Sequence, residues 1–275
     1  MPRTLIITAD DLGIDPRRDD GILLAYARGA ITQASLMVRG QSAKGAVEAA
    51  RRVGLPLGLH LDLTESPASA DPRAIPTLLD AAGNKRGKHG LRAAIAEGAI
   101  DPTDVVRETR AQLAAFEALV GQPARHVDGH QHVQSIPFLA EILAPVFAEA
   151  GVRTTRIAEQ HEVNVSDETA ARFYRSVADD ARASRGLYAA RGIDATESFI
   201  GLDLMGFSCE RERLRHALSG APGPRVELMC HPGFVGEGVD DFNQSPAREQ
   251  ELRVLTALPF ADLVARGELV LAALA

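Results

Sequence analysis

Two adjacent carboxylates, Asp10 and Asp11, directly follow residues 4–8, an apolar and β-branched run that predicts a buried strand. Like charges side by side repel each other, so the pair is costly unless a cation or a shifted pKa relieves the repulsion. One carboxylate that binds a metal ion, beside another that accepts a proton, would meet that cost. The alternative is that one aspartate caps the following turn while the other is solvated.

Histidines accompany three further strand-like segments. They are His60 in residues 57–63, His126, His130 and His132 in residues 126–132, and His231 directly after residues 225–230. A single histidine in an apolar strand is commonly a hydrogen-bonded core residue, and alternating histidines can be plain surface residues. However, the carboxyl ends of parallel strands meet at one edge of a sheet, so these imidazoles and the two aspartates converge there. One carboxylate with two imidazoles is a recognised ligand set for a divalent metal, with positions left for water and substrate.

Strand-like and helix-like segments alternate along the chain, which indicates a parallel sheet with helical crossovers. Strands are predicted near 4–8, 34–38, 57–63, 125–128, 153–157, 198–202, 225–230 and 269–271, and helices near 16–28, 43–53, 102–120, 137–150, 167–185, 209–219 and 246–258. About eight strands in 275 residues favour an α/β fold of the irregular (β/α) TIM-like barrel type. We expect one domain, residues 1–275, with a long loop insertion at about 64–90.

Composition narrows the classes of protein and of partner. The formal net charge is −7, and no basic run overrules it, so nucleic acid and anionic membranes are not expected as partners. Two cysteines cannot build a disulfide framework, and the longest apolar stretch, near 269–275, is too short to span a bilayer. The first strand begins within about four residues of the N-terminus and leaves no room for a signal peptide. We predict a cytoplasmic protein, and a homodimer is the commonest assembly for such a chain.

Four motifs resemble those of one known family. They are Thr-Ala-Asp-Asp-Leu-Gly at 8–13, Gly-Leu-His-Leu at 58–61, His-Val-Asp-Gly-His-Gln-His at 126–132 and Met-Cys-His-Pro-Gly at 229–233. They are similar to the motifs of the YdjC-like carbohydrate deacetylases, which include chito-oligosaccharide deacetylases and a hopanoid-biosynthesis-associated branch. The motifs occur in the family's order, and the resemblance runs from residue 4 to about residue 258.

The resemblance implies an irregular (β/α) barrel with a divalent metal that removes acetyl groups from N-acetylated sugars. It also implies a role for individual residues: Asp11, His60 and His130 as metal ligands, Asp10 as general base, His231 as general acid or substrate contact, and Arg156 as the group that holds Asp10 ionised and oriented. For His126, His132 and Asp128 we expect a supporting role, with Asp128 hydrogen-bonded to a ligand imidazole. Packing or surface polarity is the alternative for these three.

The sequence departs from the family pattern at four positions. The family often has Asn at position 8, Phe at 12, Ser at 129 and His at 134, where this chain has Thr8, Leu12, Gly129 and Gln134. None of these changes removes an expected ligand. They bear on substrate preference, because we expect Gln134 and the 64–90 loop to lie around the pocket.

The predicted function is metal-dependent hydrolysis that removes an acetyl group from an N-acetylated sugar or a chito-oligosaccharide-like substrate. Asp10 would take a proton from a metal-bound water, which acts as the nucleophile. The expected ion is Zn²⁺ or Mg²⁺, and Mn²⁺, Co²⁺ or Ni²⁺ could occupy the same ligands.

Two other functions remain open: a metal-dependent phosphoesterase on a similar barrel, and a non-catalytic metal- or sugar-binding protein. A phosphoesterase of this kind typically has further ligands for a second metal ion. A protein that only binds a metal needs one of the two aspartates, Asp10 or Asp11, and not both. Cys230 beside His231 also raises the possibility of a Cys–His nucleophile. Neighbouring residues on a strand point to opposite faces, so this is not our first choice.

Overall fold

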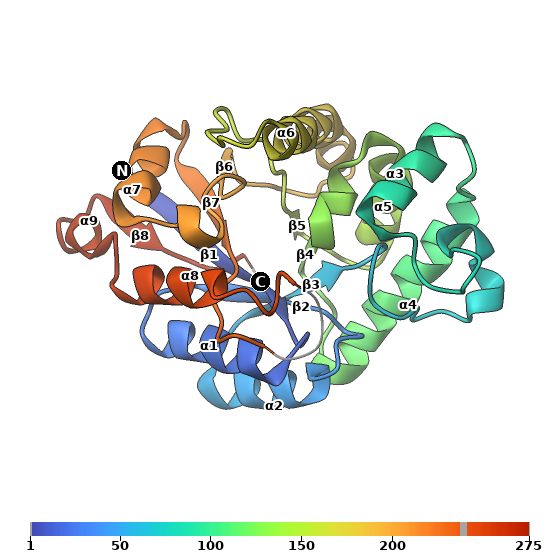
Figure 1. The fold of residues 1–275 in the computed structure, drawn as a ribbon, viewed down its shortest axis with the longest axis horizontal. Coiled ribbons are helices and arrows are strands. Elements are labelled where there is room, and N and C mark those ends of the chain that lie inside the picture. Colours follow the sequence, from blue (N-terminus) through green and yellow to red (C-terminus); the bar gives the residue numbers. More distant parts are fainter. Residues whose placement is uncertain (1, 237–240, 275) are drawn as a thin grey trace.

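The computed structural model describes residues 2–236 and 241–274 and has one curled parallel sheet at its centre (Figure 1). The strands are β1 (Arg3–Leu12), β2 (Gln33–Leu36), β3 (Leu57–Leu61), β4 (His126–Gly129), β5 (Thr154–Thr155), β6 (Ser198–Ile200), β7 (Arg225–Cys230) and β8 (Leu269–Leu271). Their order is β5-β4-β3-β2-β1-β7-β6, and β8 pairs with the beginning of β1. The predicted strands and the irregular barrel are confirmed.

The barrel is incompletely closed between β5 and β6, the two strands at the ends of the order. Both are short, with two and three residues, and offer little backbone for a ladder. Within the described residues, the pairing nearest this seam is a single bridge between Thr154 and Asp194.

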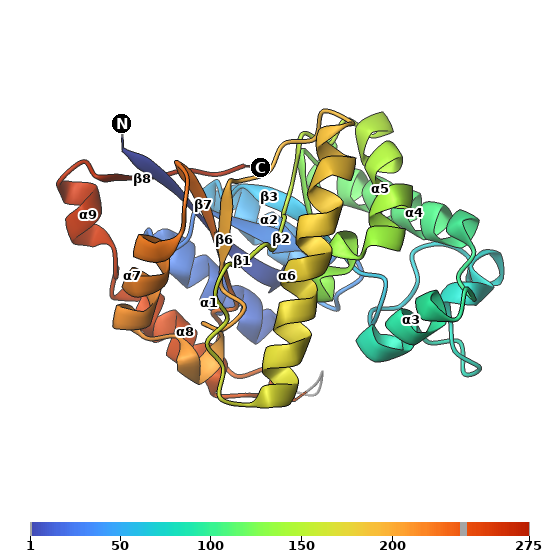
Figure 2. The ribbon, with the colours of Figure 1, turned by 90° about the horizontal axis from the view of Figure 1, so that it is seen from above.

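Helices surround the sheet in both views (Figures 1 and 2). They are α1 (Pro16–Ala27), α2 (Ala43–Val53), α3 (Gly87–Ala96), α4 (Pro102–Val120), α5 (Pro137–Glu149), α6 (Glu168–Ala189), α7 (Arg211–Gly220), α8 (Ala247–Thr256) and α9 (Ala261–Ala265). Short 3₁₀ turns cover Pro72–Ala74, Pro76–Leu78, His130–Ser135 and Gly206–Ser208. Among the described residues, no helix has both the length and the apolar character to cross a membrane.

The helix boundaries follow local sequence signals. The side chain of Asp15 accepts hydrogen bonds from the backbone N–H groups of Arg17 and Arg18, and Pro16 occupies the first position of α1. The Asp101 side chain caps α4 in the same way, and α4 ends at Gly121, whose φ of 87° is in the left-handed region. The seven helices expected from sequence are present with closely similar bounds.

The segment 64–90 contains more structure than the sequence pattern indicated, and α3 and α9 were not predicted. Two of the 3₁₀ turns and the start of α3 lie in this segment, which projects beside α4 on one side of the molecule (Figure 2). Two buried carboxylates of α4 fix it. Asp104 accepts a hydrogen bond from the Thr77 backbone N–H at 2.9 Å, and Glu108 accepts one from the Ser69 backbone N–H at 3.0 Å. Gly87 and Gly90 give the start of α3 the composition of a loop, which explains the missed helix.

Side chains alternate across β1 and divide the interior into an apolar and a polar region. Leu5, Ile7 and Ala9 belong to the apolar core that the sheet shares with the helices. Thr8 lies on the other face, where its hydroxyl donates a hydrogen bond to Glu227 of β7 at 3.0 Å. Polar side chains therefore occupy the inside of the curled sheet. The candidate site residues gather there at the C-terminal ends of the strands.

Candidate metal centre and active site

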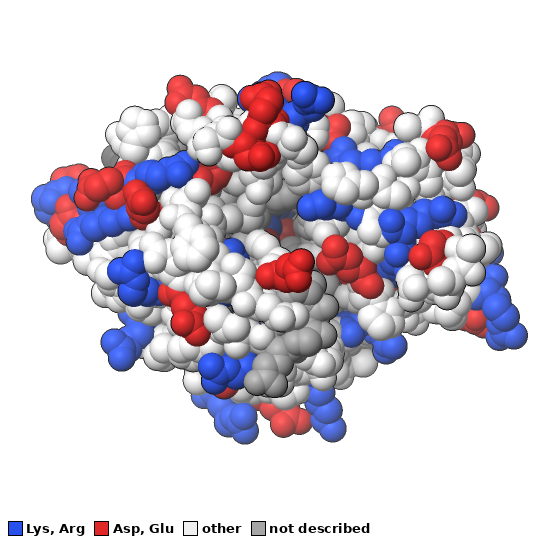
Figure 3. Space-filling view, in the orientation of Figure 1, with Lys and Arg blue, Asp and Glu red and all other residues white. Residues whose placement is uncertain are grey.

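A cavity of about 430 Å³ opens at the C-terminal ends of the strands. Its walls include Asp10, Asp11, Arg18, His60, Glu65, Lys88, His130, Gln131, His132, Phe173, Tyr174, Met205, Met229, His231, Asp241 and Phe242. The space-filling view shows a hollow at the centre of this face, with acidic and basic side chains around it (Figure 3). The cavity lies at the edge of the sheet where we expected the candidate residues to converge.

Both aspartates of the Asp-Asp pair line this cavity, although consecutive residues on a regular strand point to opposite faces. Asp11 has a φ of 67°, in the left-handed region, and the pairing of β1 with β2 shifts register between Ala9 and Leu12. A bulge of this kind re-aims a side chain, and the unusual backbone has a cost of about 1–3 kcal/mol. The irregularity places the two carboxylates side by side at the base of the cavity.

Asp11, His60 and His130 bring three candidate ligand atoms within 4.8 Å of one another. Nε2 of His60 and Nδ1 of His130 lie 3.3 Å and 3.1 Å from the same Oδ1 atom of Asp11. A carboxylate with two imidazoles matches the donors of a divalent metal site. The residues that the family resemblance implied as ligands thus meet at one point and fit a metal ion.

A sharp turn at the end of β4 presents His130 to this point. The next two residues, Gln131 and His132, have φ values of 54° and 58°. Left-handed backbone at two successive non-glycine residues is uncommon. This turn lets His130, Gln131 and His132 all line the cavity.

Asp128 of β4 lies beneath the histidines and holds His60 in place. It is fully buried, and its Oδ1 is 2.7 Å from Nδ1 of His60. It also accepts a hydrogen bond from the hydroxyl of Ser35. The imidazole therefore faces Asp11 with Nε2, which is the arrangement expected of a metal-binding histidine backed by a carboxylate.

Arg156, which follows β5, gathers the remaining buried carboxylates. Its Nη1 and Nη2 donate to the two oxygens of Asp10 at 2.6 Å and 2.7 Å, a bidentate pair. Its Nη2 is also 2.9 Å from Asp128, and its Nε donates to Glu227 at 2.9 Å. The guanidinium of Arg156 thus contacts three carboxylates, and Asp11 is a fourth carboxylate next to them. The carboxylates outnumber the guanidinium, and this excess of negative charge favours the binding of a cation.

The electrostatic environment separates the two neighbouring aspartates. Burial raises the pKa of Asp10 to about 6, although Arg156 opposes the shift. Burial acts in the same direction on Asp11, but the hydrogen bonds with His130 and His60 outweigh it and hold the pKa of Asp11 well below its ordinary value. Asp11 therefore stays ionised to a lower pH than Asp10, whose pKa is about 6.

His231, directly after β7, faces Asp10 across the cavity, with its Nε2 3.8 Å from Oδ2 of Asp10. Its backbone N–H donates to Glu251 at 2.6 Å, and its carbonyl accepts from Nη1 of Arg18 at 2.9 Å. Burial lowers the pKa of His231 well below its ordinary value, and the charges of Arg248 and Arg18 act in the same direction. The imidazole is therefore neutral in this state.

The family profile described as YdjC-like protein matches residues 4–266. This chain belongs to the YdjC-like family. It is 38% identical to the human carbohydrate deacetylase over 276 residues, which cover 92% of this chain and 84% of that protein. It is 29% identical to the chitooligosaccharide deacetylase of Serratia marcescens over 259 residues, which cover 94% of this chain and 92% of that one.

A solved structure shares the fold of this YdjC-like chain. It is that of a proposed cellobiose-phosphate cleavage protein from Enterococcus faecalis, with a TM-score of 0.74 and 23% sequence identity. The match covers 100% of this chain and 98% of that one. At this identity the likeness shows the fold alone.

One residue of this YdjC-like site, Gln134, does not lie where the sequence led us to expect. Gln134 is fully buried, donates a hydrogen bond to the Arg156 carbonyl at 3.0 Å and is not among the residues that line the cavity. His126 is also fully buried, and its Nδ1 is 2.9 Å from the Thr154 hydroxyl. Gln134 therefore supports Arg156 from behind. His126 packs below the site, whereas His132 lines the cavity.

Cys230 is not placed as a nucleophile. Its thiol donates a hydrogen bond to the Thr8 carbonyl at 3.3 Å, and burial raises the pKa of the thiol well above its ordinary value. A protonated, buried thiol is chemically inert. The pairing with His231 that the sequence permits is absent from the geometry.

Several cavity residues escaped the sequence analysis. Glu65, Lys88, Phe173, Tyr174 and Phe242 all line the cavity. Only Glu65 has a usable signal, because it follows the end of a strand-like segment, as the other acids do. Phe173 and Tyr174 lie on α6, which is far away in sequence, and helical spacing alone marks them as ordinary packing residues.

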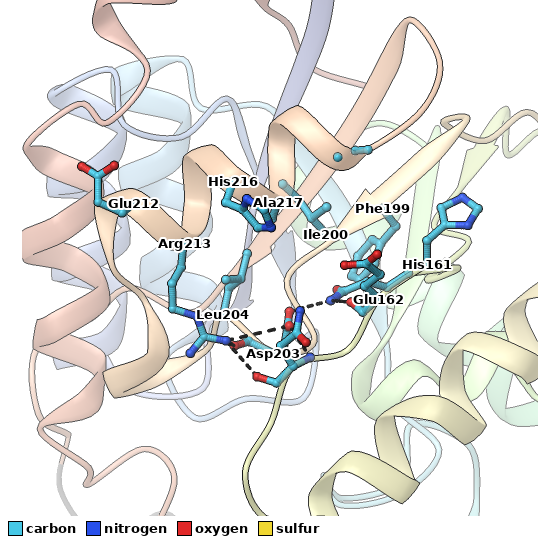
Figure 4. A pocket seen from close by; sticks show the side chains of 14 residues that line it. His161, Glu162, Phe199, Ile200, Asp203, Leu204, Glu212, Arg213, His216 and Ala217 are labelled. Atoms are coloured by element: carbon cyan, nitrogen blue, oxygen red, sulfur yellow. Dashed lines mark hydrogen bonds and ion pairs between the residues drawn. The ribbon is translucent and has the colours of Figure 1, made fainter.

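A second cavity, of about 510 Å³, lies between α7, the end of β6 and residues 160–164 (Figure 4). Arg213 and Asp203 hold two parts of its wall together. Arg213 donates to the carbonyls of Asn164 and Asp203 at 2.9 Å and 3.0 Å, and the Asp203 carboxylate accepts from the Asn164 backbone N–H at 2.7 Å. Within the described residues, none of the side-chain clusters that could hold a metal ion lies in this larger cavity.

Proposed function

We propose that this protein is a metal-dependent hydrolase that removes an acetyl group from an N-acetylated sugar of the chito-oligosaccharide type. The observation that carries the proposal is the division of roles between neighbouring aspartates. Asp11 faces two imidazoles, whereas Asp10 is held by Arg156 through two hydrogen bonds. The carbohydrate deacetylases among its relatives supply the substrate class.

Asp11, His60 and His130 are the proposed metal ligands. When bound, a divalent cation there lowers the pKa of a water ligand toward neutrality and polarises the acetyl carbonyl. Two imidazole nitrogens favour Zn²⁺, Co²⁺, Ni²⁺ or Mn²⁺ over Mg²⁺, which prefers oxygen ligands.

Asp10 is the proposed general base. Arg156 fixes both of its oxygens, so the carboxylate keeps one orientation toward the cavity. Its pKa of about 6 leaves it ionised at neutral pH and still basic enough to take a proton from the attacking water. A base of this kind contributes roughly 10²–10⁴-fold to the rate.

His231 is the proposed proton donor to the departing amine. Its Nε2 is 3.8 Å from Oδ2 of Asp10, the group that takes the proton from the attacking water. Phe173, Tyr174 and Phe242 offer apolar surface in the same cavity for the faces of sugar rings.

The direct test is acetate release. Metal-free protein would be resupplied separately with Zn²⁺, Mg²⁺, Mn²⁺, Co²⁺ or Ni²⁺ and offered N-acetylglucosamine, diacetylchitobiose and p-nitrophenyl phosphate. We expect acetate from at least one sugar, only with metal, and an unchanged rate in the Glu48→Gln control, whose exposed side chain lies on α2.

Two results would contradict the proposal. Metal-dependent phosphate release without acetate would favour a phosphoesterase. Tight metal binding without turnover of any substrate would favour a binding protein.

A further inference from the structure

His60 and His130, the two candidate ligand imidazoles, each contact a carboxylate with the nitrogen that faces away from Asp11. One of these carboxylates, Glu65, has no assigned role. His60 turns Nε2 toward Asp11 and Nδ1 toward Asp128. His130 turns Nδ1 toward Asp11, at 3.1 Å, and its Nε2 is 2.9 Å from Oε2 of Glu65. Each imidazole therefore has one nitrogen at the shared point and the other against a carboxylate.

Glu65 makes a second contact with the same turn. Its Oε1 accepts a hydrogen bond from Nε2 of Gln131, the residue after His130. One carboxylate thus contacts two consecutive residues at the sharp turn that ends β4. Because Gln131 and His132 have left-handed backbone, this turn gains from an external group that holds it.

The backbone that carries Glu65 is itself fixed. Asp62, at the end of β3, accepts hydrogen bonds from the backbone N–H groups of Thr64 and Glu65 at 2.7 Å and 3.0 Å. The Asp62 carbonyl in turn accepts from Nζ of Lys85 at 2.7 Å. The start of the segment is therefore tied to buried groups, although 46% of the Glu65 side chain surface is exposed.

A buried ion pair anchors the rest of the segment. Glu108 of α4 accepts hydrogen bonds from the backbone N–H groups of Ser69 and Ala70 at 3.0 Å and 2.9 Å, and it is paired with Lys85 at 3.1 Å. Both charged side chains are almost completely buried. This pair gives residues 62–70 one conformation, and that conformation delivers Glu65 to His130.

We propose that Glu65 is a positioning residue of the metal centre, which fixes the ring orientation of His130 as Asp128 fixes that of His60. A carboxylate on the far nitrogen of a ligand histidine sets the tautomer and makes the imidazole a stronger donor. This role rests on the metal centre of the proposed function. An exposed ion pair without such a role contributes little, so the two cases differ measurably.

The test is the Zn²⁺ dissociation constant of the metal-free full-length protein, measured by competition with a chromophoric chelator. We expect Glu65→Ala to weaken Zn²⁺ binding by about 10–100-fold. Glu65→Gln keeps an acceptor oxygen for the Nε2–H group and should lose less. Glu48→Gln, an equal change at an exposed position of α2, should leave the constant unchanged.

A second readout separates positioning from general damage. The visible absorption spectrum of the Co²⁺-loaded protein reports the ligand geometry, and we expect it to change in Glu65→Ala while the melting temperature of the metal-free variant stays near that of the wild type. If Glu65→Ala proves unstable, Glu65→Leu, which likewise offers no acceptor to His130, is measured in the same two ways.

Equal Zn²⁺ constants and equal Co²⁺ spectra in Glu65→Ala and the wild type would overturn the role of Glu65 and leave the metal centre standing. A wild type that binds no metal would overturn both. Because the readout is a binding constant, it decides the role of Glu65 even if the protein releases no acetate from any sugar.

Discussion

At the scale of single residues, Asp128 connects the two halves of the site. It contacts His60 on the metal side and Arg156 on the proton-transfer side, at 2.7 Å and 2.9 Å. Burial tends to raise the pKa of Asp128, but the charges of Arg156 and His60 hold it well below its ordinary value. A carboxylate that stays ionised in this way can orient both neighbours.

Asp128→Asn should therefore weaken Zn²⁺ binding by about 10–100-fold and reduce acetate release in parallel. The amide keeps the shape of the side chain and loses the charge that sets the His60 tautomer. The measurement is the Zn²⁺ dissociation constant of the metal-free variant, with the exposed Asp20→Asn as control. A constant equal to that of the wild type would show that Asp128 serves only the packing beneath the site.

The resemblance of the motifs to one family implied Asp11, His60 and His130 as ligands, and the structure brings these side chains together. The motifs do not indicate Glu65, because its partner His130 is 65 positions away in the sequence. No sequence signal predicts the left-handed backbone at Asp11, because the residue is not a glycine. This backbone conformation is what lets both aspartates point into one cavity.

At the scale of elements, the starts of α1 and α4 follow directly from capping residues in the sequence. Asp15 and Asp101 each precede a proline and accept the first free N–H groups of α1 and α4. In contrast, α3 begins with Gly87, has no capping side chain and contains Gly90, so its sequence resembles a loop. The segment before α3 is held in place by polar contacts with α4. The spacing of hydrophobic residues in the sequence does not reveal such contacts.

The buried pair of Lys85 and Glu108 should contribute strongly to stability, because removing one partner leaves an uncompensated charge in the interior. We expect Lys85→Met to lower the free energy of unfolding by about 3–5 kcal/mol, and the double variant Lys85→Met/Glu108→Gln to lose less than the sum of the two single changes. Urea unfolding measures this, with Lys44→Met on the exposed face of α2 as control. A loss of less than about 1 kcal/mol, as for an exposed pair, would contradict it.

Asp19, near the start of α1, should make stability depend on pH. Burial raises its pKa to about 6 from an ordinary value of 3.8, against the effect of its hydrogen bond with the Gly13 backbone N–H. The folded state therefore holds this proton after the unfolded chain has lost it, so stability falls as pH rises from about 4 to about 6. Asp19→Asn has no such penalty.

The free energy of unfolding of Asp19→Asn, relative to the wild type, should rise over this pH range by up to about 3 kcal/mol and then level off. Denaturant unfolding at several pH values measures the difference. Glu48→Gln, at an exposed position of α2, is the control and should show no trend. A flat difference for Asp19→Asn would mean that its carboxyl is ionised throughout.

At the scale of the whole molecule, the barrel gathers distant parts of the chain around one point. The candidate ligands come from β1, from β3 and from the end of β4. A bound ion therefore ties β1 to β3 and β4, from which β2 separates it in the sheet order. Alternation of strands and helices predicts such a barrel, whereas the open seam between β5 and β6 depends on strand lengths that the sequence does not reveal.

Metal binding should therefore stabilise the whole fold. Zn²⁺ at about 100 times its dissociation constant adds about 2.7 kcal/mol, which corresponds to a rise of roughly 5–10 °C in melting temperature for a chain of this size. Thermal unfolding with Zn²⁺ and with a chelator measures the shift. Zn²⁺ should not change the melting temperature of Asp11→Asn. A wild-type melting temperature that is equal with and without Zn²⁺ would contradict a metal site in the native state.

The division of labour between the adjacent aspartates is tested most directly by Asp10→Asn and Asp11→Asn, two isosteric changes one residue apart. Bound Zn²⁺ and the rate of acetate release from diacetylchitobiose would be measured on the same preparations. Asp10→Asn should bind one Zn²⁺ with nearly the wild-type constant and release acetate at least about 100-fold more slowly. Asp11→Asn should lose the metal and, with it, the activity. Undiminished acetate release by Asp10→Asn, or full Zn²⁺ binding by Asp11→Asn, would contradict these roles.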